Sequence, residues 1–174
     1  MEKIVITQDP FTLSKEIIDE YGEFLLAPEY QLRSFSVGVS FTVNDLEIIG
    51  MYGPNRYLTG LEFRNQIVAK KYVPLDAYCA QAILQNEEAC YELKSKWYQE
   101  FSHKDNTDLD TISFFGSMLV DCNKALQVLS FKYDNWTDFY QRPILTPFEA
   151  RDPWFKDDDF ALVFKEDFIK KNFE

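Results

Sequence analysis

Residues 34–43 read Ser-Phe-Ser-Val-Gly-Val-Ser-Phe-Thr-Val, and this stretch decides the expected fold. Apolar side chains alternate strictly with small polar ones along it, which predicts a β-strand with one buried face and one polar face. Asn44 and Asp45 follow, and both residue types tolerate turn conformations. Residues 46–52 then predict a return strand. We therefore expect a β-hairpin over 34–52.

The chain on either side of this hairpin predicts one strand, one helix and one ambiguous segment. Residues 3–7 favour a short strand. Asp9-Pro10 is typical of a helix start, and an amphipathic pattern continues from there and ends before Pro28. Residues 61–72 fit either a helix or a third antiparallel strand, and the preceding hairpin favours the strand.

Residues 74–130 predict two helices. The first runs from Pro74 to about Phe101, with apolar side chains at helical spacing. The second runs from about Asp110 to Ser130 and has apolar positions spaced alternately by three and four residues, as in a helix–helix seam. These seam positions are Ile112, Phe115, Leu119, Cys122, Leu126 and Leu129. We expect the two helices to pack as an antiparallel pair.

Residues 131–174 form an irregular tail, in which we expect a short strand at 160–164 and a helical turn at 166–172. The tail is expected to cover one edge of the core. The whole chain, 1–174, is then one α+β domain: a hairpin-containing half (1–73), a helical pair (74–130) and an aromatic and acidic tail (131–174). We expect an antiparallel sheet of three or more strands with about three packed helices, two of them the antiparallel pair.

The charge of the chain limits its partners. It carries 18 Lys+Arg against 29 Asp+Glu, a formal net charge of -11, and none of the three parts above is basic. We therefore expect no direct binding to nucleic acid or to an anionic membrane. The N-terminus does not resemble a signal peptide, no apolar run is long enough to span a membrane, and the three cysteines are an odd number. These features predict a cytoplasmic protein with reduced thiols.

The sequence lacks the motifs of common catalytic sites. Glycine-rich phosphate loops and the Gly-x-Ser-x-Gly motif do not occur. The single histidine, His103, falls in a polar connector. A thiol dyad of His103 with Cys122 is disfavoured, because Cys122 lies in the predicted apolar seam, where a cysteine behaves as a small buried hydrophobe. We expect no catalytic residue, no metal and no cofactor.

Two acidic segments hold the residues that we expect to bind a partner. One is the acidic face of the helix at 74–101. The other lies in the tail, where aromatic residues precede a run of aspartates. Tryptophan is enriched in interface hot spots, although these aromatics could instead fill the edge of the core. The candidate partner-binding residues are Glu87, Glu88, Glu92, Trp154, Phe155, Asp157, Asp158 and Asp159.

These features predict a non-catalytic, acidic protein-binding module of the inhibitor or immunity (anti-defence) type. Its partner would be another protein with a basic surface, such as a nucleic-acid-handling enzyme. Reversing the charge of Asp157 and Asp158 should then weaken binding with little loss of stability.

Two alternatives stay open, and so does the oligomeric state. One is a hydrolase that binds a divalent cation through Asp157, Asp159 and a helix acid. The other is a structural or small-ligand module. It would use the polar strand face of Ser34, Ser36, Ser40 and Thr42.

Overall fold

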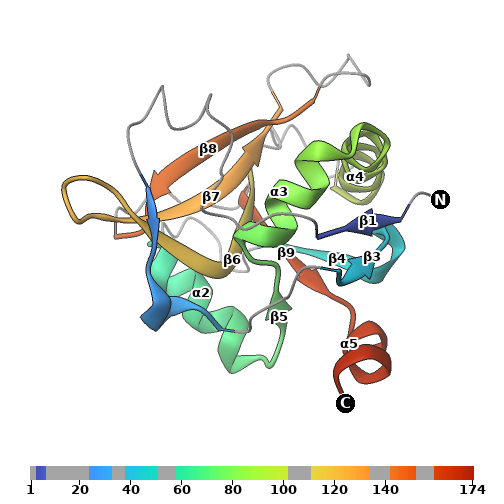
Figure 1. The fold of residues 1–174 in the computed structure, drawn as a ribbon, viewed down its shortest axis with the longest axis horizontal. Coiled ribbons are helices and arrows are strands. Elements are labelled where there is room, and N and C mark those ends of the chain that lie inside the picture. Colours follow the sequence, from blue (N-terminus) through green and yellow to red (C-terminus); the bar gives the residue numbers. More distant parts are fainter. Residues whose placement is uncertain are drawn as a thin grey trace.

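The computed structural model describes residues 3–6, 24–32, 38–50, 58–101, 111–133, 142–151 and 159–174 of the chain. Within these residues the protein has an α+β fold, as predicted, with a seven-stranded mixed sheet, a second sheet of two short strands, and four α-helices (Figure 1). In this described part, no helix combines the length and apolar character needed to cross a membrane.

Five strands lie side by side in the main sheet, and two short strands pair with them. The order of the five is β4-β9-β6-β7-β8; β6 and β9 run parallel, and the other neighbours in this order run antiparallel. Short strands β2 and β5 pair with β6 and β9, respectively. The strands are β2 (Leu25–Leu26), β4 (Leu46–Gly50), β5 (Val73–Pro74), β6 (Thr111–Val120), β7 (Leu126–Lys132), β8 (Ile144–Glu149) and β9 (Asp159–Phe164).

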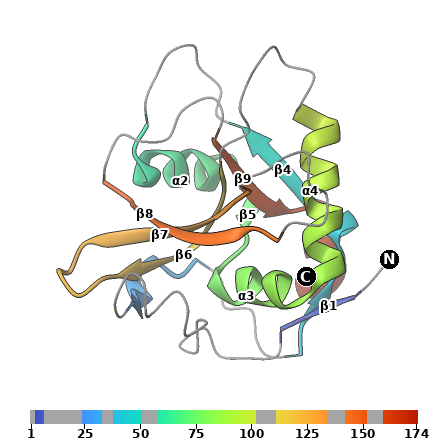
Figure 2. The same ribbon diagram turned by 90° about the horizontal axis from the view of Figure 1, so that it is seen from above.

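Helices cover both faces of this sheet (Figure 2). On one face, α3 (Ala77–Gln85) and α4 (Glu87–Phe101) share a core with Phe114 of β6. On the other, α2 (Gly60–Ala69) packs on the neighbouring residue, Phe115, whose side chain points the opposite way, as expected in a strand. The buried Arg64 of α2 also donates to the carbonyl of Phe115 at 3.1 Å.

The predicted helix at 110–130 is wrong, and so is the antiparallel helix pair. These residues form β6 and most of β7, joined by a turn. Nine of the ten residues of β6 are buried, so this segment lacks the polar face that a surface helix needs. A central strand covered on both sides buries both of its faces and has a nearly continuous apolar sequence. In such a run, apolar residues occur three and four positions apart simply because most positions are apolar, so this spacing does not indicate a helix.

The hairpin predicted over 34–52 is wrong in its described part, residues 38–50. β3 (Ser40–Phe41) pairs with β1 (Ile4–Val5) in the small sheet, whereas β4 pairs with β9 in the main sheet. Between β3 and β4 lies a 3-10 helix, η3 (Val43–Asp45). The Thr42 backbone amide donates to the Asp45 carboxylate there at 2.7 Å. The expected turn residues therefore direct the chain from one sheet into the other. The strands predicted near 3–7 and 46–52 are confirmed as β1 and β4.

Three predictions before residue 102 also need correction. Residues 61–72 contain α2 rather than the favoured strand, and the Thr59 hydroxyl accepts from the Glu62 backbone amide to cap this helix. The single helix predicted from Pro74 to Phe101 is divided into α3 and α4 at Asn86, whose backbone is extended. The helix predicted to end before Pro28 reaches the described residues only at 24–26, where the chain forms β2; residues 7–23 lie outside the described part.

The end of the tail is part of the core. The predicted strand at 160–164 and helical turn at 166–172 are confirmed as β9 and α5 (Glu166–Phe173). However, β9 lies between β4 and β6 instead of covering an edge. The ring of Phe164 contacts Phe41 with centroids 5.2 Å apart and Phe168 at 4.9 Å, which holds α5 on the sheet.

Gly116 of β6 is where the segment leading into α3 approaches the sheet most closely. A Cβ atom at this position would lie 2.6 Å from the Pro74 carbonyl oxygen and 2.7 Å from that of Leu75. The Gly116 amide donates to the Leu75 carbonyl at 2.8 Å. Only glycine fits there, and the contact fixes both β5 and the start of α3.

Candidate functional site

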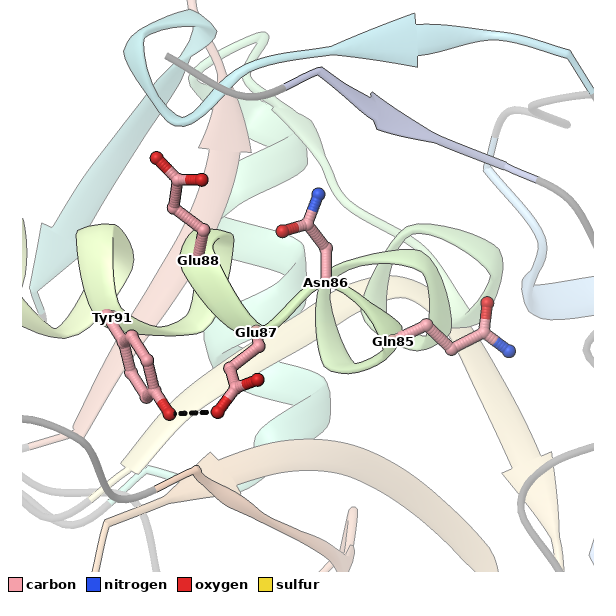
Figure 3. A pocket seen from close by; sticks show the side chains of 5 residues that line it. All are labelled: Gln85, Asn86, Glu87, Glu88 and Tyr91. Carbon is pink, nitrogen blue, oxygen red and sulfur yellow. Dashed lines mark hydrogen bonds between the residues drawn. The ribbon is translucent and has the colours of Figure 1, made fainter.

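An open hollow of about 530 Å³ lies at the junction of α3 and α4 (Figure 3). Asn86 ends α3 and caps α4, because its side-chain oxygen accepts from the Ala89 backbone amide at 3.0 Å. The first turn of α4 then presents Glu87 and Glu88 to solvent, where the helix dipole favours acidic side chains. We call the hollow at this helix junction the acidic hollow; its lining residues are Gln85, Asn86, Glu87, Glu88 and Tyr91.

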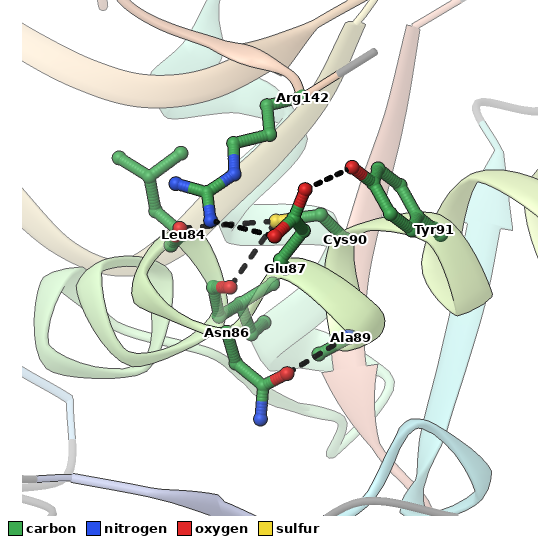
Figure 4. A network of polar contacts seen from close by, with 8 residues as sticks. Leu84, Asn86, Glu87, Ala89, Cys90, Tyr91 and Arg142 are labelled. Carbon is green, nitrogen blue, oxygen red and sulfur yellow. Dashed lines mark hydrogen bonds and ion pairs between the residues drawn. The ribbon is translucent and has the colours of Figure 1, made fainter. Parts of the chain in front are cut away.

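Two partners hold the carboxylate of Glu87 (Figure 4). The Tyr91 hydroxyl donates to its Oε1 atom, and Nη2 of Arg142 lies 3.6 Å from its Oε2 atom. This hydrogen bond to Glu87 is the main reason why the pKa of Tyr91 is raised to about 12, since an ionised phenolate could no longer donate. Glu88 points away from Glu87 in Figure 3. One acid of the pair is thus oriented by neighbours, and the other faces solvent separately.

The cysteines near this hollow are structural. Cys90 is buried, and its thiol donates to the Ile83 carbonyl at 3.2 Å, which ties the end of α3 to α4. Burial is the first cause that raises its pKa to about 12, so the thiol stays protonated at neutral pH and is a poor nucleophile. Burial also raises the pKa of Cys79.

The position predicted for Cys122 is wrong. Cys122 is exposed, because it lies in the turn between β6 and β7 rather than in a helical seam. His103 lies outside the described residues, so the disfavoured dyad of these two residues stays untested.

The structure brings together part of the predicted partner-binding set. Glu87 and Glu88 line the acidic hollow, whereas Glu92 is half-buried on the next turn of α4 and does not line it. Asp159 is the first residue of β9, in register with Thr111. The other predicted residues lie outside the described part: Trp154, Phe155, Asp157 and Asp158.

Sequence reasoning missed Tyr91 and Arg142. Tyr91 stands four residues after Glu87 on one helix, a spacing at which side chains meet, so this pair could have been found. Arg142 comes from the segment before β8, and no local pattern connects it with α4.

The acidic hollow lies on a body that is close to neutral. The described residues hold 15 acidic and 13 basic side chains, out of 29 and 18 in the chain. Most of the excess acid therefore belongs to segments outside the described part. A surface with nearly balanced charge makes a local pair such as Glu87 and Glu88 more distinctive.

The two alternative hypotheses each have residues outside the described part. Among the described residues, no three His, Cys, Asp or Glu side chains are grouped so that they could hold a metal ion, but Asp157 is not among them. Ser40 and Thr42 line a hollow of about 380 Å³ beside α5, whereas Ser34 and Ser36 are not described. Both hypotheses stay predictions.

A further hollow, of about 610 Å³, lies where β4, the end of α2, β5, β9 and α5 meet. Its charged residues come from two distant parts of the sequence, 47–71 and 166–174, and we call it the mixed-charge hollow. They are Glu47, Lys70, Lys71, Glu166, Lys170 and Glu174.

Comparisons with protein-family models, with curated protein sequences and with solved structures find no match to this chain. The geometry of these hollows is therefore the basis for inferring function.

Proposed function

We propose that the protein is a non-catalytic binding module of the inhibitor or immunity type, and that the acidic hollow contacts a partner protein with a basic surface. The observation that supports the proposal most is that two consecutive exposed acids, Glu87 and Glu88, begin α4, and that the Tyr91 hydroxyl orients the first of them. Carboxylates accept charge-assisted hydrogen bonds from Arg or Lys, and an aromatic ring favours a cation over its face.

The ion pair between Glu87 and Arg142 is compatible with such a role. Both side chains are about half exposed, and the separation of 3.6 Å is long. Exposed pairs of this kind contribute little to stability. A guanidinium group of the partner could therefore replace Arg142 at small cost, while the Tyr91 hydroxyl continues to orient the carboxylate.

The overall charge supports the same proposal through association rates. A net charge of -11 attracts a basic partner over long distances and speeds its encounter. Screening by salt weakens this attraction, so affinity for the partner should fall as ionic strength rises.

Capture of partners by the tagged full-length chain at low and high salt tests the proposal. We expect a basic protein that is retained at low salt and released at high salt. The substitution Glu88→Lys should clearly reduce capture. Asp167→Lys is the matched control, because Asp167 is likewise exposed in the first turn of a helix, α5, and the charge change is the same. Finding no basic partner, or finding capture that is insensitive to salt, would argue against the proposal.

A further inference from the structure

Lys71 has an unusual backbone conformation for a lysine. Its φ angle is 61°, in the left-handed region. The Lys71 amide donates to the Val68 carbonyl at 2.9 Å, and the Tyr72 amide donates to the Ile67 carbonyl at 3.2 Å. These two bonds form the Schellman motif that ends α2, in which glycine is usual at the left-handed position because a Cβ atom is disfavoured there. Local exceptions of this kind gather at functional sites.

Lys71 is exposed and lines the mixed-charge hollow. The volume of about 610 Å³ falls within the range of small-molecule sites. Tyr72 and Val73 line it with partly buried side chains, beside Phe164 and Ile169, which are almost completely buried. The hollow thus combines apolar surface with charged groups, as sites for small ligands do.

The charged groups of the hollow are balanced in sign. Lys170 and Glu166 form an ion pair within α5. The remaining charges are Lys70 and Lys71 at the end of α2, Glu47 on β4 and Glu174 at the end of α5. Because charged residues of both signs line the hollow, they can pair with both charges of a zwitterion. A ligand with a net negative charge would in addition be repelled by the chain's net charge of -11.

We infer that the mixed-charge hollow binds a small zwitterion with an apolar body, the chemical class of amino acids and short peptides. The ligand carboxylate pairs with Lys71, its ammonium group pairs with the glutamates, and its side chains lie on the apolar residues. This inference concerns a different surface from the acidic hollow and is independent of the proposed function.

Three probes with the same leucine side chains but different terminal charges test the ligand class. They are leucyl-leucine, its N-acetyl form, which lacks the cation, and its C-terminal amide, which lacks the anion. We expect leucyl-leucine at millimolar concentration to shift the backbone amide NMR signals of Lys71, Tyr72 and Ile169 in the full-length protein, with saturation. The two capped forms should bind roughly tenfold more weakly, because each leaves one set of protein charges without its partner. No shifts with leucyl-leucine, or equal binding of all three probes, would overturn the inference.

The substitution Lys71→Gly distinguishes an effect on ligand binding from an effect on stability. Glycine suits the left-handed position, so this variant should melt at the same or a higher temperature, yet bind leucyl-leucine roughly tenfold more weakly. Lys124→Gly is the matched control: Lys124 also has a left-handed φ, 63°, but lies in the turn between β6 and β7, away from the hollow. It should bind as the unmodified protein does. Unchanged binding by Lys71→Gly, or an equal loss in both variants, would contradict the assignment.

Discussion

The two hollows differ in how the chain builds them. The residues that line the acidic hollow all lie between Gln85 and Tyr91, at a single junction between consecutive helices. The mixed-charge hollow draws on residues from Glu47 to Glu174 and exists only because β4 and β5 both pair with β9. A site made by one short stretch leaves a signal in the sequence, whereas a site made by sheet topology does not.

The largest expected effect comes from a residue on which both hollows depend. Gly116→Ala would place a Cβ atom against backbone atoms of residues 74–76, which cannot move without displacing β5 and α3. We expect a loss of about 3 kcal/mol in the free energy of unfolding, measured by urea denaturation. In the control Gly50→Ala, the new Cβ atom would meet only the Phe160 ring, at 3.2 Å, and a smaller loss is expected. Equal losses would show that the contact at Gly116 does not fix the two hollows.

Removing the cap of α4 should have a smaller effect on stability, and it should change the acidic hollow but not the mixed-charge hollow. Asn86→Ala removes the acceptor that caps α4, and we expect a loss of about 1 kcal/mol in stability. Asn86→Asp keeps an acceptor and should restore most of it. Amide NMR signals should change around residues 85–91 and stay unchanged at Lys71 and Ile169. Changes at both places would mean that the two hollows are coupled.

The sequence predicts the local features of this molecule and fails for those that depend on sheet topology, as with the two hollows. The strands at 46–50 and 160–164 are local patterns, and the structure contains both as predicted. Glu87 and Glu88 lie exposed on a helix, and their role in partner binding stays a prediction. The helix prediction for the segment 111–132 is wrong, because burial on both faces removes the polar residues that distinguish a strand from a helix. Arg142 and Lys71 could not be found, since their places depend on partners that are distant in sequence or on a backbone angle.

The smallest expected effect concerns a single proton in the acidic hollow. The pKa of Tyr91 is raised to about 12, chiefly by its hydrogen bond to Glu87, so the neutral phenol is favoured in the folded state. This contribution to stability is complete below the usual tyrosine pKa of about 10 and is lost as the pH rises through about 12.

Glu87→Gln should therefore lower the pKa of Tyr91 towards the usual value. NMR titration of labelled tyrosine rings, with Tyr91→Phe to assign the signal, measures this change. An unchanged titration of Tyr91 would show that Glu87 does not hold its hydroxyl.

The affinity of a captured basic partner for three forms of the protein tests the central proposal most directly. Calorimetry at low salt should show about tenfold weaker binding for Glu88→Lys than for the unmodified chain, because a like charge then faces the partner. Asp167→Lys, with the same change in net charge, should stay within about twofold. Equal weakening by both substitutions would mean that only net charge matters. That result, or no weakening by Glu88→Lys, would contradict a partner site at the acidic hollow.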